Sequence, residues 1–259
     1  MKDYYLQSVK ALQLAGMSGR TQQCYTRSVR MPVDFYHTTP DLISEDELQE
    51  YFLYRINKSK WAPDTMRICY SGIKFFFINV LKREWHILNI LRAEREKRPP
   101  CVLSRSEVNR ILKQVRTFHN RVFLTAVYSC GLRLQEALYL QVSDIDGNRM
   151  MIHVHRGKQA KDRYVPLPWE ILCLLRRYQC VHRNPRLIFP ALGRNSKQAP
   201  TSKTPMAIDS VQGALRKARS AAGIKKRRVT IHTLRHSYAT HLSEPASISE
   251  SFRDIQAMP

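Results

Sequence analysis

MMIHVHRGKQAKDRYVPLP, residues 150–168, is the stretch that decides the fold class. Met150, Ile152 and Val154 occupy every second position, the period expected of a β-strand with one buried face. Residues 163–167 can return as an antiparallel partner across a turn at 157–161. Apolar residues elsewhere recur mainly at helical intervals. We therefore predict a mainly α-helical protein with a small antiparallel β-sheet or hairpin, an α+β fold.

Helical patterns lie on both sides of this hairpin. Ser104 and Glu107 have the spacing of a capping box and predict a helix start. Further helices are expected over residues 122–129, after a stop at Gly131, at 169–178, at 209–222 and over 232–242, with an irregular loop over 184–205. In the last helix, Leu234, Tyr238 and Leu242 form the stripe expected to enter the core.

The chain before the hairpin divides into two parts. Residues 1–92 predict helices over Thr21–Tyr36 and Pro63–Leu81, with a third beginning at the capping box Ser44–Glu47. A charged stretch that ends in Pro99 and Pro100 then interrupts the helical pattern. We predict a helical domain over 1–92, a linker over 93–102 and a second domain over 103–259.

The charge of the chain indicates a polyanionic partner. Lys and Arg number 43 against 21 Asp and Glu, giving a formal charge of +22. Such an excess favours nucleic acid over an anionic membrane or a merely solvated surface. The sequence contains no apolar run of the ~18 residues that span a bilayer and no signal peptide at its start. A cytoplasmic protein that binds nucleic acid is expected.

Structural zinc and disulfides are not expected from the cysteines. The six cysteines form no CxxC pair and are scattered through apolar segments, which is typical of reduced, buried thiols. His232 and His236 have the HxxxH spacing of two zinc ligands, but neither a matching Glu nor a nearby Cys completes such a site. We expect neither metal nor cofactor.

Several residues could handle a phosphate. Arg133 and Glu136 are one helical turn apart, Lys158 lies in the hairpin turn, and His232 and Arg235 are spaced i, i+3. Taken singly, the first two resemble an ordinary surface pair and the lysine a solvated turn residue. Together they are what metal-free phosphoryl transfer needs, because guanidinium groups bind phosphate oxygens and Lys or His can protonate a leaving alkoxide. Eight basic residues without an acid over 213–235 add a possible phosphate-facing stripe.

Three segments resemble the tyrosine recombinases, also called phage or integron-type integrases. They are YSCGLRLQEALYLQVSDID (128–146), HVHRGKQAKDRYVPLP (153–168) and IHTLRHSYATHL (231–242), in the family's order. GRTQQCYTRSVR (19–30) and APDTMRICYSGIKFFF (62–77) resemble its helical, SAM-like core-binding domain. The resemblance implies a core-binding domain followed by a catalytic domain that act on double-stranded DNA.

The resemblance also implies roles for single residues. Arg133 and Arg235 correspond to the two catalytic arginines, and Glu136 to the acid that braces the first of them. Lys158 corresponds to the hairpin lysine that protonates the departing 5′ oxygen, with Lys161 as an alternative, and His232 to the histidine that assists proton transfer. His236 and His241 are expected to serve structure or weak backbone contact.

Complete members of the family recombine, integrate or excise mobile genetic elements at the bacterial nucleoid as tetramers on two DNA duplexes, without a cofactor. After HxxR they carry a G-H pair and the tyrosine that attacks DNA, whereas no tyrosine follows Tyr238 here. Tyr238 belongs to the predicted core stripe, and Tyr128, Tyr139 and Tyr164 to core or strand positions. No nucleophile is identified, which gives the hypothesis of a C-terminally truncated, cleavage-incompetent recombinase.

Two alternatives remain open at this point. The first is a DNA-binding remnant that occupies sites without catalysis. The second is a general basic protein that binds RNA or DNA, in which the matching catalytic residues are accidental.

Overall fold

The computed structural model describes residues 3–83, 99–155, 162–193, 197–226 and 228–244. It divides into two compact units, residues 1–98 and 99–259, which are described separately below. Much of the predicted linker, the hairpin turn with Lys158 and Lys161, and the residues after 244 lie outside the described residues.

The first unit is helical. Its helices are α1 (Tyr4–Leu14), α2 (Gly19–Tyr36), α3 (Glu45–Asn57) and α4 (Pro63–Asn79). The predicted capping box of α3 is present, because the Ser44 hydroxyl accepts the Glu47 N–H and the Glu47 carboxylate accepts the Ser44 N–H. Aromatic residues fill the core of this unit, with Tyr51, Phe52 and Phe76 almost fully buried.

Gly72 sets the closeness of α2 and α4. A Cβ at this position would lie 2.8 Å from the Ser28 Cβ and 2.9 Å from the Tyr25 Cα. A larger residue would therefore push α4 away from α2.

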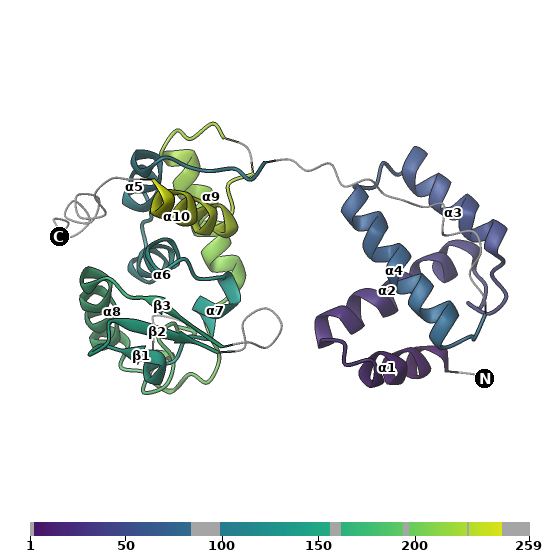
Figure 1. The fold of residues 1–259 in the computed structure, drawn as a ribbon, viewed down its shortest axis with the longest axis horizontal. Coiled ribbons are helices and arrows are strands. Elements are labelled where there is room, and N and C mark those ends of the chain that lie inside the picture. The colour runs from purple at the N-terminus through teal and green to yellow at the C-terminus, as the bar shows by residue number, and fades with distance from the viewer. Residues whose placement is uncertain (1–2, 84–98, 156–161, 194–196, 227, 245–259) are drawn as a thin grey trace. The chain divides into compact units, whose positions relative to one another are not determined.

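The second unit combines helices with a small sheet (Figure 1). Its elements are α5 (Arg105–Lys113), α6 (Phe118–Ser129), α7 (Leu134–Leu138), a short 3₁₀ helix (Val142–Asp144), β1 (Ile145–Asp146), β2 (Met151–Val154), β3 (Arg163–Pro166), α8 (Trp169–His182), a second 3₁₀ helix (Ala199–Thr201), α9 (Ile208–Ala221) and α10 (Ile231–Ser243). The prediction of a mainly helical fold with a small antiparallel sheet is confirmed.

The sheet has the order β1-β2-β3 and is antiparallel throughout. In the predicted hairpin, Ile152 pairs with Val165 and Val154 with Arg163. Ile152 and Val154 are buried, whereas His153 faces the other side of the sheet opposite Tyr164. The two-residue strand β1 was not predicted, because it is too short for a periodic pattern.

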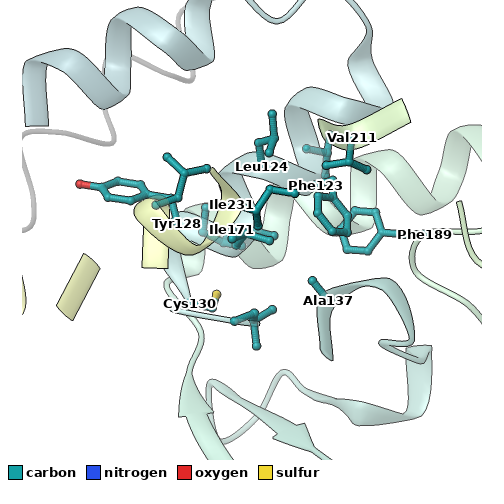
Figure 2. Packing of buried hydrophobic residues seen from close by; sticks show 14 of the residues in the cluster. Phe123, Leu124, Tyr128, Cys130, Ala137, Ile171, Phe189, Val211 and Ile231 are labelled. Carbon is teal, nitrogen blue, oxygen red and sulfur yellow. The ribbon is translucent and has the colours of Figure 1, made fainter. Parts of the chain in front are cut away.

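The core of the second unit forms around α6, a helix buried at nearly every position. Figure 2 shows Phe123 and Phe189 packed together near Val211, with Tyr128 further along the same helix. The Phe123 and Phe189 rings meet edge to face at 4.9 Å. This core fixes α7, the sheet and α10 relative to one another.

Helix α10 packs against α6, but its buried stripe differs from the predicted one. Leu234 is fully buried and Tyr238 is partly buried, as expected, whereas Leu242 is 51% exposed. The stripe continues instead through Ser237, whose hydroxyl accepts the Leu103 N–H at 2.9 Å, and through His241. Among the described residues, no helix is long and apolar enough to span a membrane.

Candidate functional site

The candidate site begins where α6 ends. Gly131 has a φ of +60°, the left-handed conformation that stops a helix, and Arg133 then forms the N-terminal cap of α7. The Arg133 N–H donates to Glu136 Oε2 at 2.7 Å, and Arg133 Nη1 donates to Glu136 Oε1 at 2.6 Å. The first turn of α7 thus ties this arginine to this glutamate.

A second arginine reaches the same carboxylate from the sheet. Arg163, the first residue of β3, donates from Nη1 to Glu136 Oε1 at 2.7 Å and from Nη2 to Oε2 at 2.6 Å. This is the bidentate geometry in which a planar guanidinium matches a carboxylate. Because Arg163 stands opposite Val154, its side chain leaves the sheet on the buried face, toward α7.

A third arginine comes from α10. Arg235 Nη1 donates to the Gly131 carbonyl oxygen at 2.5 Å and lies 3.7 Å from Glu136 Oε2. We call Arg133, Arg163 and Arg235, grouped around Glu136, the arginine cluster. Three segments that are distant in the sequence therefore meet at one carboxylate.

The surroundings of Glu136 decide its charge. Burial would raise its pKa, but the hydrogen bonds from Arg163 and Arg133 outweigh burial and lower the pKa to about 2. The Arg235 pKa is lowered, first by burial and then by repulsion from Arg133. Because one carboxylate faces three guanidinium groups, the arginine cluster keeps an excess of positive charge.

This excess is accessible from solution. The side chains of Arg133, Arg163 and Arg235 are 35%, 30% and 29% exposed, whereas that of Glu136 is 7% exposed. The buried glutamate thus holds the guanidinium groups on their protein side, while N–H donors of the arginines remain available on the side exposed to solvent. The arrangement is suited to binding an oxyanion such as a phosphate.

The structure brings together three of the five predicted site residues, namely Arg133, Glu136 and Arg235. Glu136 is too buried for an ordinary surface pair. His232 is exposed on α10, one turn before Arg235, and Lys158 lies outside the described residues.

Arg163 was not predicted as a site residue. The signal was its position in the strand, because a charged residue on the buried face of a sheet requires a buried partner of opposite charge.

The tyrosines occupy different environments. The Tyr238 ring packs on Gly131, where an added Cβ would come within 2.4 Å of it, and burial raises the Tyr238 pKa. The Tyr128 hydroxyl lies 2.9 Å from His241 Nδ1 in the core, and the burial of His241 agrees with its expected structural role. Tyr164 lies in β3, whereas the prediction of a core or strand position for Tyr139 is wrong, since it is 59% exposed after α7.

The basic segment 213–235 does not form one uniform stripe. Lys226 donates to Glu107 Oε2 at 2.6 Å and to the Val102 carbonyl at 2.9 Å, so it anchors the start of α5. Arg235 belongs to the arginine cluster. Among the described residues of the segment, the exposed basic residues that remain are Arg216, Lys217, Lys225 and Arg228.

One group within the described part of the chain has the arrangement of metal ligands. It consists of His153, His155 and Asp162 and includes neither His232 nor His236. It lies at the sheet and shares no residue with the arginine cluster.

Comparison with known proteins places the chain in a family. Residues 102–252 match the Phage integrase family, and residues 5–87 match the Phage integrase, N-terminal SAM-like domain. The chain belongs to the phage integrase family. As a tyrosine recombinase of this family, it has a SAM-like N-terminal domain and a catalytic domain, in agreement with the resemblance found in the sequence.

Phage integrase relatives cover most of the chain. An integrase/recombinase of Escherichia coli is 30% identical, over 86% of this chain and 76% of the relative. Tyrosine recombinase XerA of Pyrococcus horikoshii is 27% identical, over 90% of this chain and 77% of the relative.

Solved structures of this family share the fold. A lambda integrase dimer bound to a COC′ core site superposes with a TM-score of 0.73 at 16% identity, over 96% of this chain and 92% of that chain. XerH site-specific recombinase bound to a difH substrate gives a TM-score of 0.62 at 20% identity, over 84% of this chain and 68% of that chain.

Proposed function

We propose that this protein binds duplex DNA and that the arginine cluster holds a phosphodiester of the kind at which cleavage-competent recombinases exchange a strand. The observation that carries the proposal is the grouping of Arg133, Arg163 and Arg235 around the buried Glu136. Guanidinium groups fixed before the reaction stabilise the charge that grows on the phosphoryl oxygens in the transition state. Phosphate contacts elsewhere, including the exposed lysines and arginines after residue 213, add affinity without sequence information.

Two further residues have proposed roles at the same phosphodiester. Lys158 follows β2 and precedes β3 in the sequence, and it is proposed to correspond to the lysine that protonates the departing 5′ oxygen in cleavage-competent recombinases. His232 precedes Arg235 by one turn on α10 and is proposed to assist the proton transfer. Neither role needs a metal ion, since arginines supply the positive charge that two metal ions supply in many nucleases.

For the polypeptide of residues 1–259, we propose binding without covalent attachment. Its sequence contains no tyrosine after Tyr238, and Tyr238 itself packs on Gly131 with a raised pKa. A tyrosine held in this way is a poor nucleophile, because its ring is confined and its phenolate is disfavoured. Cleavage-incompetent occupation of DNA sites is therefore the activity proposed for these residues, and assembly into tetramers is not part of the proposal.

Selection followed by an adduct assay tests both parts. Duplexes enriched by the protein from a random pool are nicked near their centre, incubated with residues 1–259 and run on a denaturing gel. We expect a shifted complex on a native gel and no covalent product. A protein-linked 3′ end would overturn the proposed incompetence, and its loss in Tyr238→Phe would identify the nucleophile.

The general basic binder predicts a different pattern. If the arginine cluster has no special role, Arg133→Ala and Arg235→Ala should lower the affinity for all nucleic acids to the same extent, including the affinity for duplex RNA. Under our proposal, both substitutions reduce the preference for the selected duplexes over random duplexes of equal length. Arg149→Ala serves as the matched control, since it removes the same charge from the exposed turn before β2.

A further inference from the structure

We propose that His153, His155 and Asp162 form a binding site for a divalent transition metal ion, with Zn²⁺ as the preferred occupant. The site lies on the face of the sheet opposite the arginine cluster. It departs from the expectation of no metal, and it does not depend on the proposed DNA-binding function.

Strand geometry places the three side chains together. His153 lies in β2 and His155 directly follows its last residue, Val154, so with a spacing of two residues both project toward the same face of the sheet. Asp162 comes directly before Arg163, which forms the last pair of the ladder with Val154, and continuing this register by one residue brings Asp162 close to His155. One potential ligand atom from each residue lies within 4.8 Å of the others.

The two distances between Asp162 and the histidines fit a tetrahedral ion. Asp162 Oδ2 lies 3.2 Å from His153 Nε2 and 3.6 Å from His155 Nδ1. Two ligands that each stand about 2.0–2.1 Å from a tetrahedral zinc ion are about 3.3–3.4 Å apart. An ion would thus fit between these atoms with small side-chain movements, leaving a fourth position for water.

A buried carboxylate supports this arrangement. Asp144 is 5% exposed, and its Oδ1 lies 2.7 Å from His155 Nε2 while its Oδ2 accepts the Gln141 N–H at 2.8 Å. With the Nε2 proton donated to Asp144, His155 Nδ1 keeps a free lone pair directed toward Asp162. Histidines that bind metals commonly donate their second nitrogen to a carboxylate in this way, and the contact fixes the ring and its tautomer.

The chemistry of the ligands selects the metal. Two imidazoles and one carboxylate suit zinc and similar divalent ions, whereas Mg²⁺ and Ca²⁺ prefer oxygen ligands alone. The side chains of His155 and Asp162 are each 50% exposed, so an ion can enter from solution. The Tyr164 ring stacks on His153 with centroids 4.7 Å apart, which restricts that imidazole before an ion binds.

The site can be tested with the chain of 259 residues after treatment with a chelator. Isothermal titration calorimetry with ZnCl₂ at neutral pH should show one saturable binding site. His155→Gln and Asp162→Asn should abolish it, and Asp144→Asn should weaken it by about 10–100-fold, as expected for a residue that orients a ligand. His37→Asn, which changes an exposed histidine of the other unit, should bind like the wild type.

The spectrum of bound Co²⁺ separates this site from binding by cysteines. Co²⁺ bound by nitrogen and oxygen ligands gives visible absorption bands without thiolate charge-transfer bands. His153→Gln should remove these visible bands, which provides a third ligand variant in case His155→Gln or Asp162→Asn folds poorly. The proposal fails if the wild type shows no saturable site, if both ligand variants still bind, or if thiolate bands appear. Arg235→Ala should retain zinc whatever it does to DNA binding.

Discussion

Glu136 is the residue on which the candidate site depends electrostatically. It is the only carboxylate, among the described residues, for which an ion pair with Arg133, Arg163 or Arg235 is seen, so its ionised form keeps the guanidinium groups together. Its pKa of about 2 in the folded protein lies below the ordinary value of 4.5. Folding therefore favours the ionised form, and the ion pairs stabilise the fold wherever the carboxyl group is ionised.

The first prediction concerns the pH dependence of stability. Because the folded pKa is depressed, the stabilisation by Glu136 is complete above its ordinary pKa and is lost as the pH falls toward 2. At pH 7 it amounts to about 3 kcal/mol. Urea unfolding of the wild type and of Glu136→Gln between about pH 2.5 and pH 7 should give free energies that converge at the acid end. A constant difference across this range would contradict the assigned ion pairs.

The second prediction concerns Gly131, which meets two constraints at once. Its φ of +60° is unfavourable for residues with a Cβ, and an added Cβ would lie 2.4 Å from the Tyr238 ring. We expect Gly131→Ala to lower the free energy of unfolding by about 2–4 kcal/mol, the sum of backbone strain and overpacking. In the background Tyr238→Leu, part of this cost should disappear, since only the strain remains. An equal cost in both backgrounds would show that the ring is not in contact.

Single residues also show how far the site could be predicted from the sequence. Arg133, Glu136 and Arg235 were found because they belong to short motifs whose spacing is visible along the chain. Arg163 was not found, because its role arises from strand register, which brings it to Glu136 from 27 positions away. Register is a property of paired strands, and a single strand pattern shows only which residues share a face.

At the scale of elements, polar contacts hold α10 in place and thereby position its contribution to the site, Arg235. Ser237 accepts the Leu103 N–H, Arg105 donates to the His241 carbonyl at 3.0 Å, and Tyr128 meets the His241 ring. These bonds join α10 to α6 and to the start of α5. They fix the rotation of α10 and hence the direction of Arg235.

The third prediction tests this anchoring with two tyrosines of similar chemistry. Tyr128→Phe removes the hydroxyl that pairs with the buried His241 and should cost about 1–2 kcal/mol of unfolding free energy, since a buried nitrogen loses its partner. Tyr139→Phe is the matched control, because its ring is 59% exposed, and it should change stability by less than about 0.5 kcal/mol. Chemical denaturation of both variants provides the comparison. Equal effects would mean that the Tyr128 contact adds nothing.

The elements themselves were largely predictable, and the exceptions share a cause. Capping boxes gave the starts of α3 and α5, because they are local contacts between residues three positions apart. The buried face of α10 was predicted with an error at its last turn, where Leu242 is exposed and His241 is buried. Apolar periodicity overlooks a polar residue that enters the core with a partner, and here that partner, Tyr128, comes from a different helix.

At the scale of the whole molecule, charge governs the expected binding to DNA. With a formal charge of +22, we expect the proposed DNA complex to neutralise many phosphates and release their counterions, so affinity should fall steeply with salt. The slope of log affinity against log salt is about −0.9 per neutralised phosphate of duplex DNA. It therefore counts phosphate contacts and separates them from contacts whose strength depends on geometry.

The fourth prediction uses this slope to examine the arginine cluster. Arg235→Ala should weaken DNA binding and reduce the magnitude of the slope by about 1, because one phosphate contact is lost. Arg235→Lys keeps the charge but not the planar fork, so the slope should stay near the wild-type value while affinity drops. Fluorescence anisotropy with a labelled duplex at several salt concentrations measures both quantities.

Arg149→Ala, which removes a charge at an 80% exposed side chain, should leave the slope unchanged. If it lowers the slope as much as Arg235→Ala does, then the arginine cluster acts only through net charge, and a specific grip on one phosphodiester is excluded.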